Sequence, residues 1–106
     1  MPKYLLEVNY TLEGVKGLKT EGGSSRVTAV KEATEAAGGE LESMYFAFGA
    51  NDVYCIVDFP DNVTAAGTAL TVGASGAAKV RTVVLLTAAE VDAAAKAPAT
   101  YRPPGA

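Results

Sequence analysis

The sequence predicts an α+β fold in which helices cover one face of a four-stranded antiparallel sheet. Three observations indicate this fold: a hairpin-like segment over 44–59, alternation of side-chain character over 3–10 and 78–86, and helical spacing of apolar residues on both sides of the hairpin. Alternation with period two is typical of strands, and a period near 3.6 is typical of helices. The resulting order, β-α-β-β-α-β, is that of a ferredoxin-like domain, here with an extra C-terminal helix.

The first half of the chain begins with an alternating strand over 3–10. The next segment, 11–19, is expected to be a short helix or irregular, because Gly14 and Gly17 weaken helical structure. A break and N-cap over 21–25 precedes a second helix that runs to about Ala37. Gly38-Gly39 then supplies a left-handed helix stop.

The central hairpin begins near Glu40 and ends near Phe59, and it holds most of the aromatic residues. Its strands are rich in Val, Ile, Tyr and Phe, which suit a pleated surface. Gly49-Ala50-Asn51-Asp52 forms the turn. We expect Gly49 to need an unusual backbone conformation, and Asp52 to accept a hydrogen bond from a backbone N–H.

The second half repeats the helix-strand pattern. Pro60-Asp61-Asn62 ends the strand and caps a helix that runs to about Gly73. This helix is rich in Ala and Gly, so its backbone can lie close to a sheet or a partner. A strand over 78–86 follows, and Thr87 to Glu90 fits a capping box for a last helix through about Lys96. Residues 97–106 contain three of the five prolines, so we expect one domain over 1–96 and a flexible tail.

The totals describe one ordinary globular domain of 106 residues, with 49% hydrophobic and 20% charged residues. The formal net charge of −3 argues against nucleic acid as a partner, because phosphate binding requires a basic face. No apolar run approaches ~20 residues, and Met1-Pro2-Lys3 leads into a strand without a secretory pattern. We therefore expect no membrane partner and a cytoplasmic location.

The sequence contains no histidine and a single cysteine, Cys55. The absence of histidine excludes His-based triads, His-ligated metal ions and His acid–base chemistry. Cys55 lies in the middle of an expected strand, where we interpret it as a small buried hydrophobic residue rather than a nucleophile. We expect neither a metal ion nor a cofactor.

One group of candidate site residues lies on the sheet face away from the helices. Alternation assigns to that face Leu5, Glu7 and Asn9, then Tyr54, Ile56 and Asp58, and then Arg81, Val83 and Leu85. Because the first strand lies between the third and fourth in this fold, we expect Glu7, Asp58 and Arg81 to approach one another. Such a cluster is either an ion-paired dimer interface or a polar lining of a barrel interior, where buried carboxylates act as bases.

Two further candidates are local. In Gly22-Gly23-Ser24-Ser25-Arg26, free N–H groups at a helix start and the Arg26 guanidinium favour an anion, although simple capping is the alternative. Ser75 is interpreted as a cap or turn residue that faces the cleft. The candidate ligand-binding residues are thus Glu7, Asn9, Arg26, Asp52, Tyr54, Asp58, Ser75 and Arg81, and no catalytic residue is assigned.

The sequence resembles the GYD domain family over nearly its whole length. The residues that carry the resemblance are Tyr4-Leu5, Asn9-Tyr10, Gly22-Gly23, Arg26, Tyr45 to Gly49, Asp52-Val53-Tyr54, Ala74-Ser75-Gly76 and Val83 to Thr87. The Gly-Tyr-Asp motif itself is interrupted, because Gly49 and Asp52 are separated by Ala50 and Asn51. The resemblance implies a dimeric α+β barrel, a superfamily that includes small oxygenases, dehalogenases and stress proteins.

Three functions remain open at this point. The first is a small homo-oligomeric binding or regulatory protein, a dimer or larger, that holds a small and mostly apolar ligand between the sheet and the helices. The second is a cofactor-less dimeric-barrel enzyme of the monooxygenase or isomerase type that uses Tyr, Asp and Arg. The third is a structural assembly subunit. A cavity with polar groups converging in its wall favours the first two, and a filled core favours the third.

Overall fold

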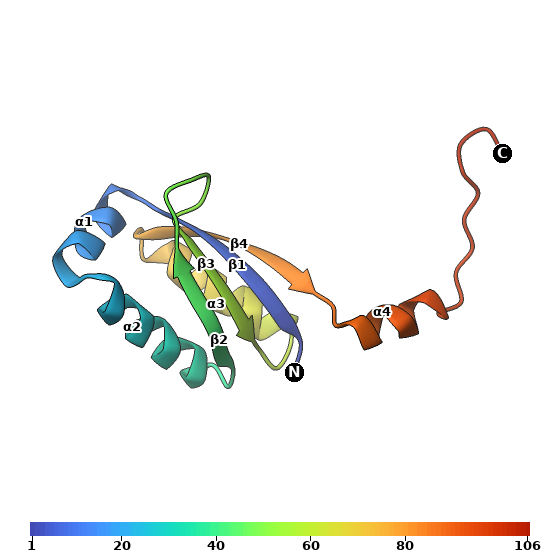
Figure 1. Ribbon diagram of the computed structural model, residues 1–106, viewed down its shortest axis with the longest axis horizontal. Coiled ribbons are helices and arrows are strands. Elements are labelled where there is room, and N and C mark those ends of the chain that lie inside the picture. Colours follow the sequence, from blue (N-terminus) through green and yellow to red (C-terminus); the bar gives the residue numbers. More distant parts are fainter.

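The computed structural model describes residues 1–106 and contains four strands and four helices (Figure 1). The strands are β1 (Lys3–Tyr10), β2 (Glu40–Phe46), β3 (Val53–Asp58) and β4 (Ala78–Leu85). The helices are α1 (Leu12–Glu21), α2 (Gly23–Ala36), α3 (Asn62–Ala74) and α4 (Ala88–Ala95). The predicted ferredoxin-like α+β fold with an extra C-terminal helix is confirmed. Of the two alternatives for 11–19, a short helix or irregular structure, the structure has the helix: α1 is ten residues long and begins after Thr11.

The sheet has the strand order β2-β3-β1-β4, and every neighbouring pair is antiparallel. In this register Glu7 lies opposite both Tyr54 and Arg81, and Leu5 lies opposite both Ile56 and Val83. Directly opposed residues in an antiparallel pair share a face of the sheet. These residues therefore define the open face, the side of the sheet that α2 and α3 do not cover.

Local capping explains where the helices begin and end. The side chains of Thr11 and Asp61 accept hydrogen bonds from the first turns of α1 and α3, and Thr87 with Glu90 completes the predicted capping box of α4. Gly22, with φ of 83°, ends α1 and begins α2. Gly38, with φ of 81°, terminates α2 in the left-handed conformation that glycine favours.

The core lies between the sheet and the helices and is small. Its fully buried members are Tyr4, Val53, Cys55, Val57, Phe59 and Ala65. The Tyr4 and Phe59 rings lie 5.9 Å apart, and the Tyr4 hydroxyl donates a 2.6 Å hydrogen bond to Asn62 at the start of α3. Because only 10 of 106 residues are buried, much apolar surface is left for ligands or further copies of the chain.

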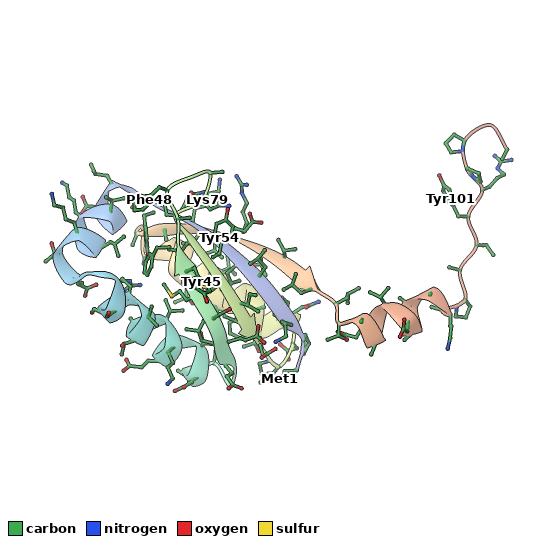
Figure 2. All side chains as sticks on the ribbon, viewed as in Figure 1. Met1, Tyr45, Phe48, Tyr54, Lys79 and Tyr101 are labelled. Atoms are coloured by element: carbon green, nitrogen blue, oxygen red, sulfur yellow. The ribbon has the colours of Figure 1, made fainter.

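The C-terminal arm, residues 86–106, leaves the body of the molecule along the direction of β4 (Figure 1). All of its residues are exposed, and Tyr101 lies far from the sheet (Figure 2). The radius of gyration is consequently 16.7 Å, whereas a compact chain of this length has roughly 13 Å. None of the four helices combines the length and the apolar composition that crossing a membrane requires.

Candidate ligand-binding cavity

A cavity of about 130 Å³ lies between the helix-side face of the sheet and helices α2 and α3. Its floor includes Leu6, Val8, Val53, Cys55 and Val80, and its roof includes Ala29, Val30, Ala33, Thr68 and Val72. The space persists because α2 and α3 present mainly small side chains there. Thirteen of the sixteen lining residues are hydrophobic, so the cavity is a largely apolar and partly open space.

The threonines in the cavity wall do not offer free hydrogen-bond donors to a ligand. The Thr34 hydroxyl donates a 2.7 Å hydrogen bond to the Val30 carbonyl, and the Thr68 hydroxyl donates a 3.0 Å bond to the Thr64 carbonyl. Each hydroxyl is thus turned onto its own helix, as is usual for threonine within a helix. Their methyl groups and the aliphatic side chains remain to contact a ligand.

Tyr10 and Arg26 form the polar end of the cavity. Both residues also line an adjoining depression of about 340 Å³, whose walls include Glu13, Glu21 and Ser75. Arg26 Nη1 lies 3.8 Å from Glu21 Oε2, a long ion pair that leaves hydrogen-bond donors of the guanidinium available. Burial raises the pKa of the Tyr10 hydroxyl, and the neighbouring Arg26 opposes that rise. A ligand in the cavity therefore meets two hydrogen-bond donors at this end.

A second polar cluster lies on the open face of the sheet, around Asn51. Asn51 Nδ2 donates to Glu7 Oε2 at 2.8 Å and to the Tyr54 hydroxyl at 3.2 Å, and Asn51 Oδ1 accepts from Asn9 Nδ2 at 3.1 Å. The residue is only 4% exposed. Sequence reasoning treated Asn51 as an ordinary turn residue. The signal for its role was the placement of two polar residues, Glu7 and Asn9, on one face of an otherwise apolar strand.

The family model for the GYD domain matches residues 4–95, which include all four helices and all four strands except the first residue of β1. The chain belongs to the GYD domain family. No curated protein and no solved structure matches it. The match covers the cavity and the Asn51 cluster as well as α4, so these features are parts of the GYD domain.

The predicted cluster of Glu7, Asp58 and Arg81 does not form in this GYD domain. The antiparallel register places Asp58 opposite Lys3, at the start of β1 and four residues from Glu7. Lys3 Nζ bonds to Asp58 at 3.0 Å and to Glu42 at 2.8 Å, and these two bonds raise the pKa of Lys3. Arg81 does face Glu7 across β1 and β4, but it is exposed and makes no ion pair within 4.0 Å.

Two other predicted residues of the GYD domain have backbone partners. Asp52 Oδ2 accepts a 2.8 Å hydrogen bond from the Tyr10 N–H, the kind of bond expected of it, and so joins the hairpin loop to β1. Ser75 Oγ donates to the Val72 carbonyl at 2.6 Å and accepts from the Ala77 N–H at 3.2 Å. Ser75 therefore stabilises the turn after α3 while also lining the depression beside Arg26.

Proposed function

We propose that this GYD domain is a homo-oligomeric binding protein that holds a small, mostly apolar molecule in the cavity between the sheet and helices α2 and α3. The observation that carries the proposal is an apolar cavity that ends at Tyr10 and Arg26. A dry apolar cavity of about 150 Å³ binds benzene. A volume of about 130 Å³ is slightly smaller, so it suits a molecule no larger than a single ring or a short branched chain, with a polar group directed toward Arg26.

The ionisable groups in the cavity wall favour binding over catalysis. Burial raises the pKa of the Cys55 thiol to about 11, and burial also raises the pKa of Tyr10. Both groups are therefore protonated at neutral pH, and neither is an efficient general base or nucleophile there. Arg26 remains charged and acts as a hydrogen-bond donor and not as a base.

The apolar part of the open face supports assembly with a second copy. Leu5, Ile56 and Val83 are adjacent there in the pairing register, and Tyr45 and Tyr54 extend the surface along the hairpin (Figure 2). Tyr45 is 72% exposed and Val83 is 38% exposed. Contiguous apolar surface of this kind marks interaction sites, and packing of two identical faces is the commonest way to bury it.

Native mass spectrometry of the protein purified from its own host tests both parts of the proposal. We expect a dimer or larger assembly that carries a small molecule, and we expect that molecule to be released on unfolding. A monomer would contradict the assembly, and a ligand-free protein that also fails to bind small apolar probes would contradict the binding function.

A further inference from the structure

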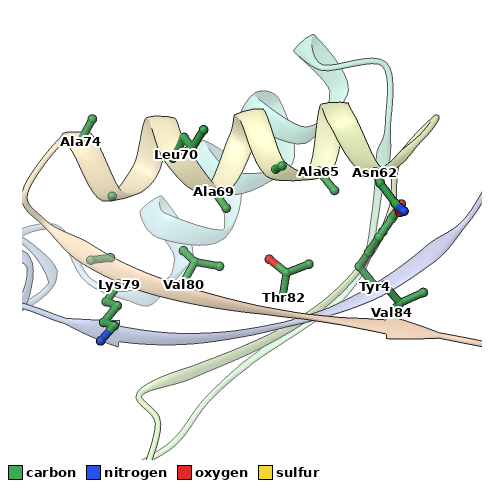
Figure 3. Close-up of a pocket in the computed structure, with 13 residues that line it drawn as sticks. Tyr4, Asn62, Ala65, Ala69, Leu70, Ala74, Lys79, Val80, Thr82 and Val84 are labelled. Atoms are coloured by element: carbon green, nitrogen blue, oxygen red, sulfur yellow. The ribbon is translucent and has the colours of Figure 1, made fainter.

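A long open groove lies between α3 and β4, next to the cavity, with which it shares Ala78 and Val80 (Figure 3). Its volume is about 890 Å³. The α3 side is formed mostly by small residues, among them Ala65, Ala69 and Gly73, and the β4 side presents Val80, Thr82 and Val84. Lys79 is the single charged residue of the lining, but it lies opposite Asn9 in the sheet, and its side chain points away from α3 (Figure 3). The groove is thus wide and apolar.

The floor of the groove is also an edge strand of the sheet, and its two charged residues, Lys79 and Arg81, lie on the open face. β4 pairs with β1 on one side, and its other side has no partner strand. The strand is eight residues long and contains no proline. Proteins usually protect such an edge with proline, charge, a bulge or a covering helix or loop. An element seated in the groove would cover this edge.

Helix α4 is an element that needs a partner. All eight of its residues are exposed, and Val91 and the preceding Leu86 are large apolar residues that are more than half exposed. Isolated helices shorter than about 12–15 residues are marginal in water, so the capping box of Thr87 and Glu90 is not sufficient to hold this helix. The composition of α4, five alanines in eight residues, makes it a slim helix that fits a groove.

We propose that α4 of each copy docks in the groove between α3 and β4 of a second copy, so that two copies exchange their C-terminal arms. At 1.5 Å per residue, α4 is about 12 Å long and α3 about 20 Å, so the groove accommodates the whole helix. The two-residue link of Leu86 and Thr87 directs α4 away from its own groove (Figure 1).

The arm contact is separate from the sheet-face contact proposed above. It uses the helix side of β4 and the outer surface of α3, whereas the sheet-face contact uses Leu5, Ile56 and Val83 on the opposite side. Reciprocal exchange is a closed, two-fold arrangement in which both grooves are filled. The two contacts can therefore be tested independently.

Disulfide trapping between two differently tagged copies tests the exchange. One copy carries Leu70→Cys in the groove, and the other carries Val91→Cys in the arm. Both positions are exposed, and the native Cys55 is buried and does not compete. After mixing and mild oxidation, we expect a covalent heterodimer of the two tag sizes. The matched control replaces Leu70→Cys with Val63→Cys, which lies on α3 and is 81% exposed but does not line the groove, and we expect little crosslink from it.

Three results would overturn the proposal. The first is equal crosslinking from Val63→Cys and Leu70→Cys, which would indicate random collision. The second is a chain carrying both cysteines that forms only an internal disulfide in a monomer, which would show α4 folded back into its own groove. The third is no crosslink from two thiols that both react with an alkylating reagent. If Leu70→Cys does not fold, Ala74→Cys, about one turn further along α3 and also in the groove lining, takes its place.

Discussion

Asn51 in the loop between β2 and β3 donates a 2.8 Å hydrogen bond from Nδ2 to the Glu7 carboxylate in β1. The same side chain contacts Asn9 and Tyr54, so one buried amide joins the loop to two strands. The neighbouring Phe48 is fully exposed at the surface of the loop (Figure 2). Asn51 thereby anchors the loop that carries the exposed Phe48 side chain.

Asn51→Ala is expected to lower the free energy of unfolding by about 1–3 kcal/mol, because it leaves Glu7 and Asn9 without their shared partner. Thermal unfolding followed by circular dichroism measures the loss. Ala50→Ser, one residue earlier and exposed, is the control and should leave the melting temperature unchanged. Equal melting temperatures for the two variants would contradict a structural role for the Asn51 cluster.

Two glycines of α1 are expected to respond in opposite ways to alanine. A Cβ at Gly14 would clash with the Ala77 carbonyl and lie 2.9 Å from the Tyr10 ring, whereas a Cβ at Gly17 meets nothing within 4 Å. Gly14→Ala should therefore destabilise the protein by about 1–3 kcal/mol. Gly17→Ala should stabilise it by about 0.5–1 kcal/mol through helix propensity. Denaturant unfolding measures the change in the free energy of unfolding for each variant. A change of the same sign in both would show that α1 does not pack as described.

Cys55 is expected to resist alkylation. Its pKa of about 11 leaves almost no thiolate at pH 8, so iodoacetamide should label it only after unfolding. Because the folded-state pKa lies above the ordinary value of 9.0, the protonated thiol stabilises the fold below pH 9, and this contribution is lost between pH 9 and about 11.

Comparing the free energy of unfolding of Cys55→Ala with that of the wild type from pH 8 to 11 isolates this contribution. The wild type should lose stability relative to the variant as the pH rises across that interval. Rapid labelling of the native protein at pH 8, or a difference that stays constant with pH, would be inconsistent with a buried thiol.

Ile56→Lys is expected to dissociate the sheet-face dimer. Ile56 lies opposite Leu5 at the centre of the apolar part of the open face, so a lysine there would bring a charge into each copy's contact surface. Light scattering at micromolar concentration should report a smaller assembly than the wild type. Val63→Lys, on the exposed side of α3, is the control and should leave assembly unchanged. If Ile56→Lys forms an assembly of the same mass as the wild type, the interface does not lie on the open face.

The sequence was sufficient to predict the fold because its signals are local and mutually consistent. Period-two alternation predicted β1 and β4, and the capping box of Thr87 and Glu90 predicted the start of α4. Gly49 was the local exception: its φ is not positive and its Cβ would meet nothing within 4 Å, so the expected need for glycine there is wrong. The left-handed glycine after α2, Gly38, was predicted correctly.

The site was less predictable because it depends on how far apart residues lie along paired strands. Alternation correctly put Glu7, Asp58 and Arg81 on one face, but only the register shows that Asp58 lies beside Lys3. The cavity depends on the three-dimensional gap between α2 and α3, which no pattern in either helix reveals. The sequence predicted that Arg26 binds an anion at a helix start. Only the structure shows that Arg26 lies at the end of the cavity.

The claim that the cavity binds a small apolar molecule is tested most directly by an NMR titration of the ¹⁵N-labelled protein with p-cresol. The ring of p-cresol suits the cavity volume, and its hydroxyl can accept a hydrogen bond from Arg26. We predict saturable shifts of wall amides such as those of Val30 and Val80, and loss of these shifts in Ala29→Leu, which fills the cavity. The shifts should persist in Ala36→Leu, at the exposed C-terminal end of α2 and outside the cavity wall. Wall amides that do not shift, or equal binding by Ala29→Leu, would contradict the claim.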